Sequence, residues 1–288
     1  MLMQDIDFLI IGATKSATTW LQRSLQADPC VSMPDPELHY FSRAYSRGDD
    51  WYLSQFAATA STLVAGEKSN SYLESREAAD RIAEKLPHVK LVAQLRNPVE
   101  RAYSDYCMMY RRGEVGRDVE RYLDPRNSQG EHARLVGLGF YGRQLQAYYD
   151  RFPSERILVT FYETIGTQPE EHLATVRSFL GLPATPSGSV VRGKVKDKTT
   201  PMLRPELRRV LRSLKPVVAP LRNNPYFQKV HSALATEISY SPFPDSSRAR
   251  LIDHYAADVE ALGRLVGRDL SAWLGHSATP PTDKVETL

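Results

Sequence analysis

"IIGATKSATTW" (residues 10–20) sets the fold of this chain, because it joins an apolar strand to a helix through a loop suited to an anion. Residues 6–11 are mostly apolar, which predicts a buried strand before the loop. The Walker phosphate loop requires Gly-Lys after four intervening residues, and Ala17-Thr18 stands there instead. Lys15 comes too early for that loop, which leaves open what phosphate-like group is held here.

Strand-like and helix-like segments alternate outward from this loop, which is typical of a parallel sheet covered by helices. Strands are expected at residues 6–11, 61–69, 89–96 and 156–163, and helices at 18–28, 75–86, 98–112, 139–153 and 169–182. Asn97 and Pro98 can cap and open the helix at 98–112. We therefore predict an α/β fold, a three-layer sandwich with a central parallel sheet, helices on both faces and a P-loop-like nucleotide-binding core.

Composition indicates a globular chain with one domain. Hydrophobic residues make up 42% and charged residues 25% of the 288 residues, which excludes a fibrous or disordered protein. We expect a single domain over residues 1–276, and a disordered tail at 277–288, which is polar and proline-rich. Two cysteines are too few for a disulfide scaffold and lack metal-ligand spacing.

Two features bear on location and partners. No apolar run approaches the roughly 20 residues of a membrane span, and the start is acidic where a signal peptide would be basic, so we expect a cytoplasmic protein. Basic residues gather between positions 192 and 215, which favours an anionic ligand. The aromatic residues that would stack nucleic-acid bases are missing from that segment. The oligomeric state is not readable from the sequence.

Two segments at expected strand ends are candidate anion sites. Lys15, Ser16, Thr18 and Thr19 offer hydroxyls, one cation and the N–H groups of a helix start, although a capped helix with an exposed lysine gives the same pattern. In "LRNPVERAYSDY" (95–106), Arg96 can bind a phosphate bidentately and Ser104 can supply a second donor. A structural ion pair is the alternative for Arg96. Arg101 either contributes to the site or lies solvated at the surface.

The segment "DPELHYFS" (35–42) carries the candidate general bases, Glu37 and His39. Either side chain can accept a proton from an acceptor hydroxyl, a role worth roughly 10²–10⁴ in rate. A lone Glu or His in a loop is more often a surface group or a satisfied hydrogen-bonding group. The sequence leaves these alternatives open.

Together these segments resemble the sulfotransferases that use 3′-phosphoadenosine 5′-phosphosulfate (PAPS), in particular the heparan-sulfate-type and related bacterial carbohydrate branch. "ATKSATTWL" (13–21) is similar to their 5′-phosphosulfate loop, Lys-x-Gly-Thr-Thr/Ser. The similarity assigns donor binding to Lys15, Ser16, Ala17, Thr18, Thr19 and Trp20. Ala17 takes the place of the usual glycine.

"RNPVERAYSDY" (96–106) resembles the complete Arg-x-Pro-x-x-Arg-x-x-Ser-x-Tyr pattern of the 3′-phosphate loop, which implies that Arg96 and Ser104 bind this phosphate. "ELHYFS" (37–42) is similar to the Glu-x-His-Phe-Phe segment whose glutamate is the catalytic base, here Glu37. "GEKSNSYL" (66–73) resembles Glu-Lys-Thr-Pro-x-Tyr, which implies an active-site lysine at Lys68, with Asn70 where the family has proline.

The family likeness continues toward the end of the chain. "GKVKDKTTP" (193–201) is similar to the Gly-Lys-x-Lys-Gly-Arg loop that closes over the nucleotide. This match assigns Lys194, Lys196 and Lys198 to the donor, although Asp197 replaces glycine and Lys198 replaces arginine. Residues 240–274 resemble the C-terminal helix and its terminal tryptophan, Trp273, which we expect to be structural.

The resemblance implies sulfuryl transfer from PAPS as co-substrate, without a metal, to a hydroxyl or less readily an amine of a small-molecule, carbohydrate or glycolipid acceptor. Adenosine 3′,5′-bisphosphate would be released. In this reaction Glu37 takes the acceptor proton, with His39 as the alternative base. Lys15 stabilises charge on the bridging oxygen, and Lys68 steadies the sulfonate or the acceptor.

Acceptor contacts are the least determined part of the prediction. Tyr141 and Gln144 are candidates, and residues 112–139 form either an insertion or a lid. Two other functions remain open. One is an ATP-dependent small-molecule kinase of the P-loop class, and the other is a non-catalytic binder of nucleotide or polyanion.

Overall fold

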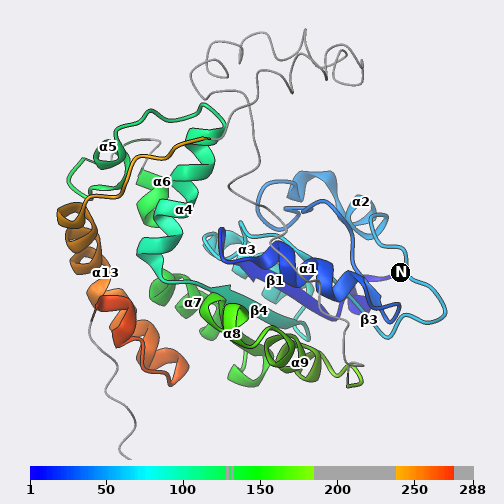
Figure 1. Ribbon diagram of the computed structural model, residues 1–288. Helices are drawn as coiled ribbons and strands as arrows, with labels where there is room; N and C mark the ends of the chain where they lie inside the picture. The colour runs from blue at the N-terminus through cyan, green and yellow to red at the C-terminus, as the bar shows by residue number, and fades with distance from the viewer. Residues whose placement is uncertain (128–129, 131–132, 185–237, 276–288) are drawn as a thin grey trace, which may run out of the picture.

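The computed structural model describes residues 1–127, 130, 133–184 and 238–275. In this part of the chain the strands form a five-stranded sheet in the order β2-β3-β1-β4-β5, and all neighbouring strands are parallel (Figure 1). The strands are β1 (Phe8–Gly12), β2 (Val31–Ser32), β3 (Val64–Lys68), β4 (Lys90–Leu95) and β5 (Ile157–Phe161). The predicted parallel α/β sheet is confirmed.

In the described ranges the helices are α1 (Thr18–Gln26), α2 (Asp49–Leu53), α3 (Arg76–Lys85), α4 (Pro98–Arg111), α5 (Val119–Leu123), α6 (Ala133–Gly137), α7 (Tyr141–Tyr149), α8 (Tyr162–Thr167), α9 (Pro169–Leu180) and α13 (Asp245–Val266). The helices predicted from the sequence are present as α1, α3, α4, α7, α9 and α13, whereas α2, α5, α6 and α8 were not predicted. The start of α4 is as expected, because the Asn97 side chain accepts hydrogen bonds from the N–H groups of Val99 and Glu100 at 3.0 and 3.3 Å.

The two faces of the sheet bury alternate residues of β1, because successive side chains of a strand point to opposite sides. Phe8 and Ile10 pack in one apolar cluster with residues of α1 and α9. Leu9 and Ile11 pack in the other cluster with residues of α3 and α7. The predicted three-layer sandwich is confirmed, with helices on both faces of the sheet.

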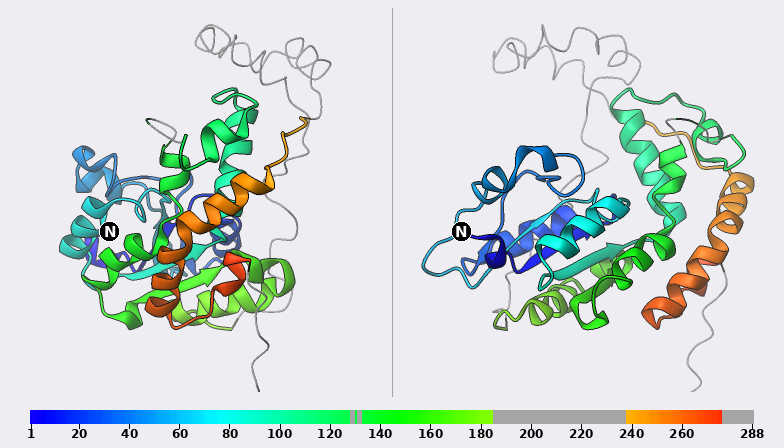
Figure 2. Two further views of the ribbon diagram at one scale, coloured as in Figure 1. Left: turned by 90° about the vertical axis from the view of Figure 1, so that its left-hand side faces the viewer. Right: turned by 180° about the vertical axis from the view of Figure 1, so that it is seen from behind.

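Helix α13 forms a flank to these layers and packs against α4, α5 and α7 (Figure 2). Its apolar face buries Leu251, Tyr255, Val259 and Leu262. Trp273 is 7% exposed and contacts the rings of Tyr141 and Phe161. The structural role expected for the C-terminal helix agrees with this packing. The segment 112–139 contributes α5 and α6, which pack against α4.

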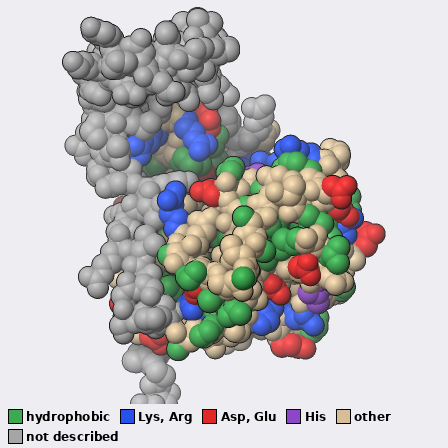
Figure 3. Space-filling view, turned by 90° about the vertical axis from the view of Figure 1, so that its right-hand side faces the viewer, with side chains coloured by type: hydrophobic (Ala, Val, Ile, Leu, Met, Phe, Trp, Pro, Cys, Tyr) green, Lys and Arg blue, Asp and Glu red, His purple; other side chains and the backbone are tan. Residues whose placement is uncertain are grey.

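Several sequence predictions lie outside the described residues. They concern Lys194, Lys196, Lys198, the basic segment 192–215 and the tail at 277–288. On the face of the described chain in Figure 3, acidic and basic side chains are scattered among polar and apolar ones. None of the helices in the described ranges is both long enough and apolar enough to cross a bilayer.

Candidate active site

The carboxyl ends of four parallel strands place the candidate residues at one edge of the sheet. The loop with Lys15 follows β1, Lys68 ends β3, and Arg96 follows β4. The loop with Glu37 and His39 follows β2. In open α/β sheets this edge is where ligands bind. The structure therefore brings together residues that lie up to 81 positions apart, the separation of Lys15 and Arg96.

The loop between β1 and α1 has an unusual backbone. Lys15 and Ala17 adopt left-handed conformations, with φ angles of 70° and 62°. Left-handed geometry costs a non-glycine residue about 1–2 kcal/mol, which explains why glycine is usual at the position of Ala17. Ser16 is fully buried, and its hydroxyl has no hydrogen-bond partner among the described residues. Turns of this kind orient backbone N–H groups into concavities that suit anions.

Arg96 connects this loop to the end of β4. Its Nη1 donates to the Lys15 carbonyl at 3.3 Å, and its guanidinium carbon lies 4.4 Å from the centre of the Tyr162 ring. Within the described ranges no carboxylate pairs with Arg96, so the structural ion pair is not what the structure shows. Ser104 lies two turns into α4 and is 6% exposed.

Arg101 differs from both interpretations given to it. It is fully buried, forms an ion pair with Asp105 at 3.3 Å, and donates to the Leu135 carbonyl. The interpretation as a solvated surface group is wrong, because α6 and α13 cover this face of α4. The guanidinium joins α4 to α6 and has no surface for a ligand.

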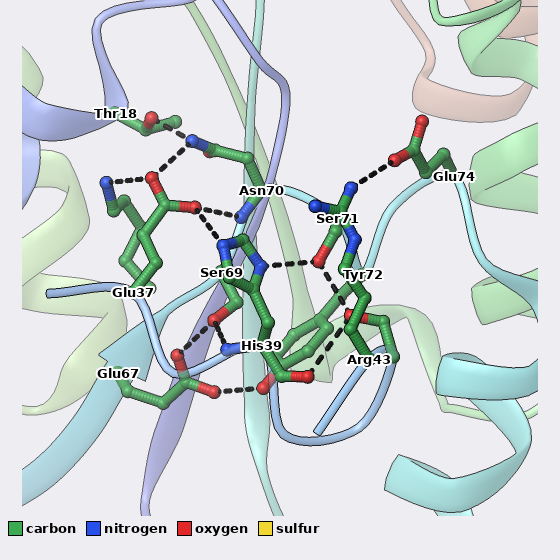
Figure 4. Close-up of polar contacts among 12 residues, drawn as sticks. Thr18, Glu37, His39, Arg43, Glu67, Ser69, Asn70, Ser71, Tyr72 and Glu74 are labelled. Atoms are coloured by element: carbon green, nitrogen blue, oxygen red, sulfur yellow. Dashed lines mark hydrogen bonds and ion pairs between the residues drawn. The ribbon is translucent and has the colours of Figure 1, made fainter. Parts of the chain in front are cut away.

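Glu37 lies within a group of polar side chains (Figure 4). Lys68, which is 3% exposed, donates from Nζ to Glu37 Oε1 at 2.7 Å. Asn70 donates from its backbone N–H to Oε2 at 3.0 Å and from Nδ2 to Oε1 at 3.1 Å. His39 Nε2 lies 3.8 Å from Oε2. The structure thus brings Glu37, His39 and Lys68 into one cluster, as the resemblance implies.

Electrostatics set the charge state of this cluster. Burial acts to raise the pKa of Glu37, but the Lys68 ammonium and the Asn70 N–H outweigh it and hold that pKa below its ordinary value of 4.5. Burial lowers the pKa of His39 below its ordinary value of 6.5, against the opposing effect of Glu37. At neutral pH the cluster therefore holds an ionised carboxylate beside a neutral imidazole.

A second, deeper carboxylate supports the loop that carries these groups. Glu67 is 1% exposed and accepts hydrogen bonds from the hydroxyls of Ser69 at 2.8 Å and Tyr72 at 2.5 Å. The same two hydroxyls accept the backbone N–H groups of His39 at 2.8 Å and Phe41 at 3.3 Å. Glu67 thus fixes the backbone around the candidate base. Sequence reasoning missed it, although it precedes Lys68 in a segment already singled out.

A buried chain of polar groups also reaches the loop of residues 13–17. His172 Nδ1 lies 2.7 Å from Thr164 Oγ1, and His172 Nε2 lies 3.0 Å from Gln94 Oε1. Gln94 in turn donates from Nε2 to the Ser16 carbonyl. Burial lowers the pKa of His172 to about 4, so the ring is neutral at physiological pH. Trp20 packs edge-on against the His172 ring, and the two ring centres lie 5.8 Å apart.

The two candidate acceptor contacts lie on α7. Tyr141 is fully buried against Trp273, which leaves no surface for an acceptor, so the structure gives this prediction no support. Gln144 is part-exposed, and its Nε2 donates to the Gly137 carbonyl at 3.2 Å. Its role stays a prediction.

Similarity to known proteins agrees with this architecture. A family model described as the sulfotransferase domain matches residues 5–204. Human heparan sulfate glucosamine 3-O-sulfotransferase 6 is 34% identical over 177 residues, which cover 60% of this chain and 52% of the human protein. The bovine bifunctional heparan sulfate N-deacetylase/N-sulfotransferase 2 is 31% identical over 192 residues, which cover 61% of this chain and 22% of the bovine protein. The chain thus matches about half, or less, of the length of these curated relatives.

A solved structure shows the same fold. The crystal structure of a sulfotransferase from Alicyclobacillus acidocaldarius aligns with a TM-score of 0.68 over 93% of this chain and 98% of that chain, at 23% identity. The family match spans well over half of the sequence and includes every described candidate residue. The chain belongs to the sulfotransferase domain family.

Proposed function

We propose that this protein transfers a sulfuryl group from PAPS to a hydroxyl, or less readily an amine, of a small-molecule, carbohydrate or glycolipid acceptor. One observation carries the proposal: the ionised Glu37, paired with Lys68 at 2.7 Å, lies at the same sheet edge as the loop of residues 15–19. A carbohydrate acceptor is favoured because relatives with 30% identity or more are named for heparan sulfate.

The residues at this edge suit the two anionic ends of PAPS. The left-handed turns at Lys15 and Ala17 fit the 5′-phosphosulfate, and so does the Ser16 hydroxyl, to which the described part of the chain offers no hydrogen-bond partner. Arg96 at the end of β4, with Ser104 on α4, fits the 3′-phosphate. These assignments follow the family resemblance, residue by residue.

In the proposed reaction the acceptor oxygen forms a bond to sulfur while the bond from sulfur to the bridging oxygen breaks. The acceptor proton passes to the Glu37 carboxylate, and adenosine 3′,5′-bisphosphate leaves with the electron pair. Lys15 stabilises the charge on the leaving oxygen, and Lys68 neutralises the sulfonate or orients the acceptor. Most of the rate then comes from positioning and charge stabilisation, as in phosphoryl transfer.

His39 is the alternative base, because its imidazole is neutral at pH 7 and its Nε2 faces Glu37. Its Nδ1 lies 2.7 Å from Ser71 Oγ, which orients the ring. Glu37 is favoured by the resemblance and by its contact with Lys68. The lowered pKa of Glu37 makes it a weaker base. For proton transfer to Glu37, bound acceptor and donor must raise that pKa or lower the pKa of the acceptor hydroxyl.

Calorimetric titration with adenosine 3′,5′-bisphosphate tests the donor site, with ATP plus magnesium titrated in parallel. We expect bisphosphate binding that is lost in Arg96→Ala, with ATP much weaker. Magnesium-dependent ATP binding without bisphosphate binding would overturn the proposal in favour of a kinase. Bisphosphate binding without transfer to any acceptor would favour the non-catalytic binder.

Substitution of Glu37 by Gln tests the base. Transfer of labelled sulfate from PAPS to a panel of glucosamine-containing saccharides and hydroxyl-bearing small molecules should fall by roughly 10²–10⁴, because general-base catalysis is lost. Bisphosphate binding should persist. The matched variant is His39→Asn. If Glu37→Gln stays near wild-type activity while His39→Asn loses it, His39 is the base.

A further inference from the structure

Asn70 stands where the resembled segment has proline. It links Glu37, the candidate base, to the loop of residues 15–19, which we call the candidate donor loop because the resemblance assigns it to PAPS. Its backbone N–H and Nδ2 both donate to Glu37, at 3.0 and 3.1 Å. Its Oδ1 accepts a hydrogen bond from Thr18 Oγ1 at 2.8 Å (Figure 4). Proline has neither an N–H nor an amide side chain, so it would make none of these three contacts. This bridge is therefore specific to the residue that this chain carries.

The chemistry of the partners fixes the direction of each hydrogen bond. Glu37 is ionised and can only accept, so the NH₂ group of Asn70 must face it. The amide oxygen of Asn70 therefore faces Thr18, and the Thr18 hydroxyl must donate its single proton to that oxygen. The lone pairs left on Thr18 Oγ1 would repel an anionic oxygen.

Thr18 thus has to leave Asn70 before its hydroxyl can donate to a phosphate. Thr18 is the first residue of α1 and is 3% exposed, so little water reaches its hydroxyl to replace Asn70 as its partner. An anion in the loop and Asn70 compete for the same proton. When the anion takes it, the Asn70 amide loses one of the contacts that hold it against Glu37.

We propose that Asn70 is a positioning residue that couples donor binding at residues 15–19 to Glu37. Without the donor, Asn70 accepts the hydrogen bond of the Thr18 hydroxyl and holds that hydroxyl away from the donor site. When the donor binds, Thr18 leaves Asn70, and the Asn70 amide is held less firmly against the Glu37 carboxylate. This inference rests on the proposed function, because it takes residues 15–19 as the 5′-phosphate site. Coupling between two sites is reciprocal: if donor binding weakens the contact between Asn70 and Glu37, that contact must in turn weaken donor binding. Removing the Asn70 side chain should therefore change the affinity for the donor as well as the contacts of Glu37.

Calorimetry with adenosine 3′,5′-bisphosphate tests this coupling without an acceptor. In Asn70→Ala the Thr18 hydroxyl no longer has its competing partner, so the bisphosphate should bind tighter by about three- to tenfold, the worth of one hydrogen bond. A merely structural Asn70 would give weaker binding instead. Asn70→Pro, which introduces the residue of the resembled segment, should show the same tightening and serves if Asn70→Ala unfolds.

The double-mutant cycle with Thr18→Val isolates the bridge. The tightening should disappear in the Thr18→Val background, because no hydroxyl is left for Asn70 to hold. Gln146→Ala, an exposed amide on α7, is the control and should bind as wild type does. Unchanged or weaker binding in Asn70→Ala, or tightening that persists without the Thr18 hydroxyl, overturns the coupling. Failure of the wild type to bind the bisphosphate overturns the proposed function itself, and the coupling with it.

Discussion

Glu67 shows how one buried side chain can make stability depend on pH. Burial raises its pKa from the ordinary 4.5 to about 7, although Tyr72 and Ser69 donate to it and favour the ionised form. The folded state therefore holds its proton at pH values where the unfolded chain has already lost it. An acid with a raised folded pKa contributes stability that is complete below pH 4.5 and is lost as pH rises toward 7.

Substitution of Glu67 by Gln should remove this part of the pH dependence. Between pH 5.5 and 8 the wild type should lose about 2 kcal/mol more unfolding free energy than Glu67→Gln, at 1.36 kcal/mol per pKa unit. Urea unfolding of both proteins at the two pH values measures the difference. Parallel pH profiles would show that Glu67 is ionised in the folded state throughout this range.

Helix α9 and strand β4 support the candidate donor loop through two side chains. His172 on α9 contacts Gln94 on β4, and Gln94 donates to the Ser16 carbonyl of the loop. Replacing His172 with Phe leaves the Gln94 oxygen buried without its partner, at a cost of about 1–3 kcal/mol. We expect a loosened loop and adenosine 3′,5′-bisphosphate affinity reduced by about tenfold, which corresponds to 1.4 kcal/mol. Thr175→Ala, on the exposed face of the same helix, is the matched control. Equal affinity in all three proteins would show that the loop holds its shape without this chain of hydrogen bonds.

At the scale of the whole molecule, helix α13, near the end of the chain, packs against residues 136–139, which precede α7. Tyr255 is fully buried and donates to the Val136 carbonyl at 2.7 Å. A Cβ at Gly139 would lie 2.6 Å from Tyr255 Cζ, so Gly139→Ala must displace the helix or the ring. We expect a loss of about 1–3 kcal/mol in unfolding free energy, as for other overpacked cores.

Gly137→Ala is the matched control, because a Cβ there meets no atom within 4 Å. In a helix this change is neutral or stabilises by up to about 1 kcal/mol. Denaturant unfolding of both variants gives the comparison. Equal stabilities would mean that α13 is not tightly docked at Gly139.

Local patterns in the sequence account for much of the fold. The continuous apolar run of β1 predicts a buried strand, and Asn97 with Pro98 predicts the start of α4. Lys68 and Arg96 could be identified because each stands in a short motif at a predicted strand end, and Glu37 because its motif resembles that of the family. The short strand before Glu37, β2, was not predicted. The burial of Arg101 and Tyr141 could not be predicted, because both side chains are covered by α13 or the segment around it, more than 100 positions away.

The amino-acid sequence was enough to establish the parallel α/β architecture, the resemblance to the sulfotransferase family and the strand ends at which Lys15, Lys68 and Arg96 lie, because strand and helix periods and short motifs are local properties. The contacts of Asn70 with Thr18 and Glu37, and the reach of His172 through Gln94 to Ser16, depended on the folded chain. Hydrogen bonds form only within about 3 Å, and packing of distant strands and helices sets those distances.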